Sequence, residues 1–301
     1  MHSLNSALVA VAALALGALG VTGSAQTFRS TVDLVSLGVT VTDREAAIVT
    51  DLSADDFEIF EDGKPQRITL FAPGHADPAP ALHLGVLFDC SGSMEEDIRF
   101  SRSAAIKFLN TLPDAADVTL VDFDTEVRVT RYSQADFPRL VERLRRRKPD
   151  GYTAMHDAMG VYLDGAAGEE GRKIFVLYTD GMDTSSAMTF AETLDLLRAS
   201  DVTMYAVGFL GSVGASRTME QRMRLQQMTE STGGLAFFPQ ALKDLDATYA
   251  KVVEEIRAQY TLGYVSANTR TDGNWRKTEI KVKRPGVKVR SRKGYFAPFR
   301  Q

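Results

Sequence analysis

The sequence predicts an α/β fold in which helices flank a doubly wound, mostly parallel sheet, together with a small β-sandwich. The apolar runs at residues 82–88 and 173–179 predict strands buried on both faces of a sheet, and each is followed by an aspartate. Between residues 81 and 259, strand patterns alternate with helix patterns, as in parallel sheets. Residues 27–75 and 260–301 show strand patterns alone, so we expect these two β segments to form one sandwich into which the central domain is inserted.

The periodicity of the central domain locates its elements. In the first predicted helix, Ile98, Ala105 and Phe108 share an apolar face, and charged residues lie off that face. A Pro-rich linker at residues 74–80 marks the boundary that precedes the domain. We expect helices at residues 94–112, 137–147, 153–166, 190–199, 219–230 and 242–259, and further strands at residues 118–123, 127–132, 202–209 and 235–238.

Turn signals and charge organise the two flanking segments. Asp62-Gly63 lies between apolar segments and favours a tight hairpin. Residues 278–290 alternate apolar with mostly basic residues around Pro285-Gly286, which suits a type II turn, and predict a second hairpin. Eleven Lys or Arg stand against two acids in residues 270–301, whereas residues 51–62 are rich in acids. We favour a solvated strand face paired with those acids; a patch for an acidic polymer or lipid is the alternative.

Composition and the N-terminal residues bound the class of protein. With 301 residues, 44% hydrophobic and 25% charged residues and a net charge of −4, the chain has a globular composition and no whole-molecule signal for nucleic acid. The apolar run at residues 8–20 and the small residues before position 26 predict a signal peptide, residues 1–25, and hence export. The run lacks a positively charged start. An uncleaved anchor is the alternative, but the run is shorter than the roughly 20 residues that span a bilayer.

No later segment is apolar enough to cross a membrane, so we expect no transmembrane span in the mature chain. The single cysteine, Cys90, excludes an intramolecular disulfide and a multi-cysteine metal site. We expect Cys90 to be a buried small apolar residue rather than a reactive thiol.

Oxygen-bearing side chains cluster after the predicted strands. Asp89, Ser91 and Ser93 alternate directly after the first buried strand, and Asp180 follows the second. Thr153 begins the predicted helix at residues 153–166. Because open parallel sheets bind ligands at the carboxyl ends of their strands, we expect a site at this edge.

These residues resemble the metal-ion-dependent adhesion site of the von Willebrand factor type A domain. Its signature is Asp-x-Ser-x-Ser after the first core strand, then a Thr on a later loop, then an Asp after a further strand; here these are Asp89-Cys90-Ser91-Gly92-Ser93, Thr153 and Asp180. The whole mature chain also resembles a secreted bacterial subgroup of this family, seen most in acidobacteria, through Val41-Thr42-Asp43, residues 56–64 and residues 292–296.

The resemblance implies a metal site and a protein partner. Carboxylate, hydroxyl and water oxygens suit Mg²⁺ or Mn²⁺. By resemblance, Ser91, Ser93 and Thr153 are direct ligands, and Asp89 and Asp180 bind directly or through water. An open coordination position then accepts an Asp or Glu carboxylate of a protein partner. We expect an exported, non-enzymatic binding module for adhesion or assembly.

Two alternatives stay open. One is a structural envelope scaffold with a vestigial metal site. The other is an aspartate-based, metal-dependent phosphatase with Asp89 as its nucleophile, but such enzymes carry a second Asp where this chain has Ser91. The chain also lacks a Gly-x-Ser-x-Gly elbow and a phosphate-binding Gly-x-x-x-x-Gly-Lys loop.

Overall fold

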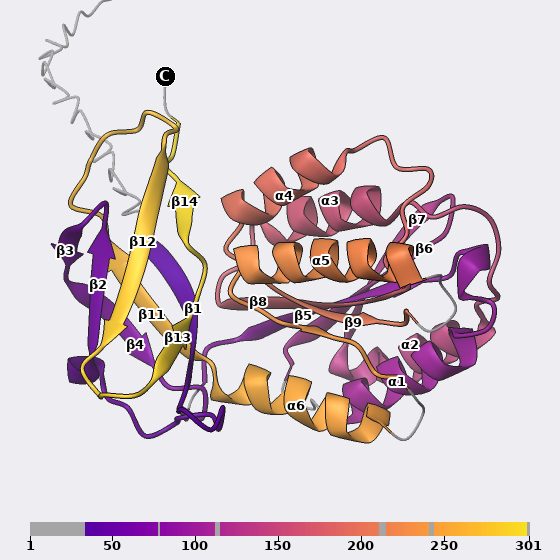
Figure 1. Ribbon diagram of the computed structural model, residues 1–301, viewed down its shortest axis with the longest axis horizontal. Helices are drawn as coiled ribbons and strands as arrows, with labels where there is room; N and C mark the ends of the chain where they lie inside the picture. The colour runs from indigo at the N-terminus through magenta and orange to yellow at the C-terminus, as the bar shows by residue number, and fades with distance from the viewer. Residues whose placement is uncertain (1–33, 78, 112–114, 211–214, 241–243, 300–301) are drawn as a thin grey trace, which may run out of the picture. The chain divides into compact units, whose positions relative to one another are not determined.

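The computed structural model describes residues 34–77, 79–111, 115–210, 215–240 and 244–299 (Figure 1). The predicted signal peptide at residues 1–25 lies outside the described residues. A six-stranded sheet forms the centre of the domain, in the order β10-β9-β8-β5-β6-β7. All neighbouring strands are parallel except β7, which runs antiparallel to β6. The strands are β5 (Leu82–Asp89), β6 (Asp117–Phe123), β7 (Val127–Ser133), β8 (Arg172–Thr179), β9 (Thr203–Gly208) and β10 (Ala236–Phe237).

Helices cover both faces of this sheet, as the alternating pattern predicts (Figure 1). The core on one face includes Phe108 of α1, Leu140 of α2 and Val252 of α6. The opposite core includes Met159 of α3, Leu197 of α4 and Met228 of α5. The helices are α1 (Ile98–Thr111), α2 (Phe137–Arg146), α3 (Met155–Ala166), α4 (Phe190–Ala199), α5 (Ala215–Ser231) and α6 (Leu245–Ala258). Within the described ranges, no helix has the length and apolarity that a bilayer span requires.

The N-terminal and C-terminal segments together build two antiparallel sheets, which confirms the predicted fold class. Their orders are β13-β1-β11-β4 and β14-β12-β2-β3, so each sheet contains strands from both ends of the chain. Leu37, Ile59, Leu262 and Ile280 belong to the core that the two sheets share. The strands are β1 (Leu34–Thr42), β2 (Phe57–Glu61), β3 (Lys64–Gln66), β4 (Ile68–Ala72), β11 (Tyr260–Val265), β12 (Trp275–Val282), β13 (Lys288–Arg290) and β14 (Gly294–Phe296).

One predicted hairpin is confirmed and the other is wrong. Glu61 pairs with Lys64 across Asp62 (φ 48°) and Gly63 (φ 79°), as in a type I′ turn. Residues 278–290 do not form a hairpin, because β12 pairs with β2 and β14 whereas β13 pairs with β1. Ile280 and Val282 of β12 and Val289 of β13 pack in or against the shared core, so the turn at Gly286 (φ 77°) carries the chain from one sheet to the other.

Ion pairs connect the acidic and basic segments, as the charge pattern predicts. The Arg284 guanidinium donates to both carboxylate oxygens of Asp51, at 2.7 and 3.2 Å. The Lys283 ammonium donates to the Asp55 carbonyl at 2.7 Å. These basic residues therefore have partners within the sandwich.

The sandwich contacts the central domain at the amino-terminal end of its parallel strands. Arg292 is buried and donates to the carbonyls of Ser200, just before β9, and Ser36 of β1. Arg290 of β13 forms an ion pair with Glu255 of α6. The predicted site lies at the opposite, carboxyl-terminal ends of β5 and β8.

Candidate metal site

The end of β5 places a carboxylate inside the domain. Asp89 is fully buried at the last position of the strand. The neighbouring strand β8 ends at Thr179, whose hydroxyl donates to Asp89 Oδ2 at 2.6 Å. Register explains this contact, since Phe88 pairs with Tyr178 and the next residues on both strands are therefore adjacent. Thr179 also accepts a hydrogen bond from the Gly181 amide, at 3.0 Å.

The turn after β5 brings both predicted serines to Asp89. Ser91 donates to Asp89 Oδ1 from its amide at 2.9 Å and from its hydroxyl at 2.6 Å. The hydroxyl oxygens of Ser91 and Ser93 are 3.1 Å apart. Ser93 lies in a 3₁₀ turn, Gly92–Met94, and α1 begins only at Ile98, later than predicted. Cys90 is fully buried, as predicted.

A second loop carries Thr153 to the same edge. The Gly92 amide donates to the Gly151 carbonyl at 3.1 Å, which joins this loop to the serine turn. Thr153 is 2% exposed and precedes the start of α3, rather than beginning the helix. Its amide donates to the Thr184 hydroxyl at 2.9 Å, and its carbonyl accepts from the Thr184 amide at 2.9 Å. The loop after β8 therefore fixes the backbone on both sides of the Thr153 side chain.

Asp180 completes the set of predicted ligands. It follows β8, is 1% exposed, and accepts a hydrogen bond from the Met182 amide at 2.9 Å. Burial, and then the negative charge of Asp180, raise the pKa of Asp89 to about 7. Among the described residues no basic side chain forms an ion pair with either carboxylate. Two acids are thus buried close together with only hydroxyl and amide donors as recorded partners.

This donor set fits a hard divalent cation. All five predicted ligands offer oxygen and lie at one edge of the sheet: Asp89 at the end of β5, and Ser91, Ser93, Thr153 and Asp180 on the loops beside it. Mg²⁺ and Mn²⁺ prefer such oxygens, whereas zinc prefers nitrogen and sulfur. In the part of the chain that the structure describes, no three His, Cys, Asp or Glu side chains gather as a metal site. A cation here would therefore depend on the hydroxyls.

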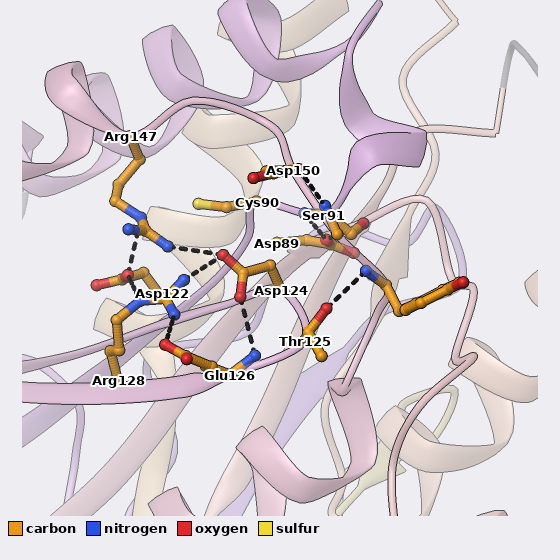
Figure 2. Close-up of polar contacts among 12 residues, drawn as sticks. Asp89, Cys90, Ser91, Asp122, Asp124, Thr125, Glu126, Arg128, Arg147 and Asp150 are labelled. Carbon is orange, nitrogen blue, oxygen red and sulfur yellow. Dashed lines mark hydrogen bonds and ion pairs between the residues drawn. The ribbon is translucent and has the colours of Figure 1, made fainter.

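Beside this edge lies a network of acids and arginines that the sequence did not reveal (Figure 2). Asp122 of β6 is fully buried and forms ion pairs with Arg128 (3.1 Å), Arg143 (2.6 Å) and Arg147 (3.0 Å). Asp124 pairs with Arg128 and Arg147. Arg147 stands at the start of the loop that carries Thr153, so the network holds that loop against β6. The only available signal was an acid inside an otherwise apolar strand.

The fold and the site define an α/β protein with a candidate oxygen-ligand metal site at the carboxyl edge of its sheet. Residues 83–251, more than half of the chain, match the model of the von Willebrand factor type A domain. The chain belongs to this family. No curated protein sequence matches the chain.

Solved structures share the fold. A von Willebrand factor type A protein from Catenulispora acidiphila has a TM-score of 0.50 and 13% identity, over 91% of this chain and 76% of that one. The pilus adhesin SpaC from Lactobacillus rhamnosus GG, in its open conformation, has a TM-score of 0.51 and 12% identity, over 83% of this chain and 49% of that one. The PilB minor pilin from Streptococcus sanguinis has a TM-score of 0.48 and 13% identity, over 60% of this chain. The match covers 62% of PilB, so this chain spans less than two thirds of that protein. At these identities the likeness to the first two structures shows the fold alone.

Proposed function

We propose that this protein is a metal-ion-dependent binding module that engages an acidic residue of a protein partner in adhesion or assembly, and that it is not an enzyme. Asp89, Ser91, Ser93, Thr153 and Asp180 would hold Mg²⁺ or Mn²⁺. One observation carries the proposal: Asp89 and Asp180 are buried together, and two serine hydroxyls lie within 3.1 Å of each other beside them.

The charge of the site suits a carboxylate ligand. When bound, the cation supplies a Lewis-acidic position for an external oxygen. Asp89 and Asp180 together balance the charge of a divalent ion, and the three hydroxyls add no negative charge. The metal and its protein ligands would therefore carry no net negative charge that repels a partner's carboxylate.

The recorded contacts weigh against the phosphatase alternative. Such an enzyme needs an acid two residues after its nucleophile, and this position is Ser91. The Ser91 hydroxyl donates to Asp89 Oδ1, so it holds the carboxylate in place. A serine hydroxyl is too weak an acid to donate a proton near neutral pH, so Ser91 does not replace the general acid of such an enzyme.

Export and adhesion are supported by the kind of protein that shares the fold. SpaC is a pilus adhesin, and we propose a comparable place outside the cell for this chain. Membership of the secreted acidobacterial subgroup is part of this proposal. The scaffold alternative would require that the oxygen ligands bind no cation.

Isothermal titration of MgCl2 and MnCl2 into the EDTA-stripped protein tests the proposal. We expect one site, with affinity lowered at least about tenfold in Ser91→Ala/Ser93→Ala, since a ligand contact is worth at least one to two kcal/mol. Ser103→Ala is a matched control, because Ser103 is exposed on α1 and bonds only to the Arg99 carbonyl among its recorded contacts. Equal binding by the double variant contradicts the assigned ligands, and no binding by the wild type favours the scaffold.

A further inference from the structure

A second candidate site lies between the sandwich and the central domain. A cleft of about 530 Å³ is lined by Trp275, Lys293 and Phe296 of the sandwich segment and by side chains from α4 and α5. This volume falls within the roughly 300–1,000 Å³ of small-molecule sites, which often lie where domains meet. Figure 1 shows β12 and β14 beside the ends of α4 and α5, away from the carboxyl ends of β5 and β8 that carry the metal edge.

One wall of the cleft is an aromatic platform. Trp275 pairs with Phe296 across β12 and β14, and their ring centroids are 5.0 Å apart in an edge-to-face arrangement. The two residues are 39% and 41% exposed. A Cβ at position 294 would lie 2.4 Å from Trp275 Cζ2, so Gly294 lets the indole rest on the β14 backbone. The platform is thus held in place while part of both rings faces solvent.

The other walls mix hydrogen-bond donors with acceptors. Arg198 comes from α4, and Gln227, Glu230 and Ser231 come from α5. Lys293 precedes β14 on the sandwich side. Arg198 forms an ion pair with Asp195 at 3.1 Å, and Lys293 and Glu230 are exposed. Charges of both signs therefore border the aromatic rings.

This combination selects the chemistry of the ligand. The Glu230 carboxylate would repel a polyanion, and the positive charges of Lys293 and Arg198 would repel a cation. A wholly apolar ligand would cover these groups without pairing them, which is unfavourable. A sugar ring has an apolar C–H face that can stack on an indole, and its hydroxyls both donate and accept hydrogen bonds.

We propose that this cleft binds an oligosaccharide, with a sugar ring stacked on Trp275 and its hydroxyls bonded to Gln227, Glu230 and Lys293. The site requires no metal and goes beyond the protein-binding function proposed above. A module with both sites could hold a glycan with one face and a protein with the other.

Fluorescence tests this directly, because Trp275 is the only tryptophan of the chain. The full protein is titrated with cellohexaose, chitohexaose and mannohexaose, each up to about 10 mM, with EDTA present throughout. We expect a saturable change in tryptophan emission with at least one of them. A response to none of the three overturns the proposal, as does a response only to a thymidine hexanucleotide tested in parallel.

Calorimetry with variants tests the assigned contacts. Gln227→Ala and Lys293→Gln change exposed residues and should each weaken sugar binding about fivefold to tenfold. Lys281→Gln is the matched control, because Lys281 lies on the same strand as Trp275 but over the Phe60 ring, 4.7 Å from its centroid. Unchanged affinity in both cleft variants, or an equal loss in Lys281→Gln, would contradict the site.

Discussion

Replacing Asp89 with asparagine should stabilise the metal-free protein at pH 8, although Asp89 is central to the proposed site. Burial beside Asp180 raises the pKa of Asp89 from its ordinary value of 3.8 to about 7. The folded state then holds a proton more tightly than the unfolded state, so stability is lost as the pH rises from about 4 to about 7. At about 1.4 kcal/mol per pKa unit, the ionised carboxylate costs the folded protein about 4 kcal/mol at pH 8.

Asparagine removes this cost but disturbs the hydrogen bonds from Ser91 and Thr179, a loss of about 1–2 kcal/mol. The expected net gain in the free energy of unfolding is about 3 kcal/mol at pH 8. It is close to zero at about pH 5, because taking up the proton there costs the wild type only about 1–2 kcal/mol, as much as the variant loses with the hydrogen bonds. Urea unfolding in EDTA, followed by circular dichroism at both pH values, measures the difference. In saturating Mg²⁺ the order should reverse, because the cation stabilises only the protein that binds it.

Asp122→Asn is the matched control for this experiment. Asp122 is equally buried on the adjacent strand, but Arg128, Arg143 and Arg147 form ion pairs with it. Removing one partner of a buried network leaves charges uncompensated, so this variant should lose about 3 kcal/mol or more at both pH values. The reasoning is refuted if Asp89→Asn is less stable than the wild type at pH 8, or if its advantage does not depend on pH.

Three further predictions concern the sandwich. Glu61 is 2% exposed and accepts hydrogen bonds from Tyr264, Tyr295 and Ser266; Glu61→Ala should therefore lower the free energy of unfolding by about 3–5 kcal/mol in urea titrations, and a loss below 1 kcal/mol would contradict a structural role. Arg284→Gln breaks an exposed ion pair with Asp51 and should leave the free energy of unfolding nearly unchanged in the same assay; a loss as large as that of Glu61→Ala would mean that the pair is not screened by solvent. A chain ending at residue 259 lacks β11, β12, β13 and β14, so limited proteolysis should cleave its residues 34–72 rapidly; resistance equal to that of the full chain would show that the two segments fold separately.

The sequence allowed the candidate site to be located because topology places strand ends predictably. Asp89 ends β5 and Asp180 directly follows β8 in the same parallel sheet, and neighbouring parallel strands end at one edge. Thr153 was assigned to the site by its order along the chain, and the Gly92–Gly151 hydrogen bond brings its loop beside the serine turn. By contrast, nothing in the pattern distinguished Thr179 from any other polar residue at a strand end.

Contacts that depend on the choice of partner strand were harder to predict. The hairpin at residues 278–290 failed because alternation identifies the buried face of a strand but not the sheet to which it belongs. The Asp122 network could not be predicted from the sequence because it depends on the register between β6 and β7. Arg128 of β7 lies directly opposite Asp122 of β6. Arg147 follows the end of α2, and only the folded chain brings it next to Asp122.

The central claim is that the hydroxyls of the serine turn and the buried acids hold a divalent cation. A crystal grown with MnCl2, measured on both sides of the manganese absorption edge, tests this claim most directly. We predict one strong anomalous peak within bonding distance of the Ser91 and Ser93 hydroxyls and beside Asp89 and Asp180. Full-occupancy manganese elsewhere with none at these residues, or no peak in crystals that retain the fold, would contradict it.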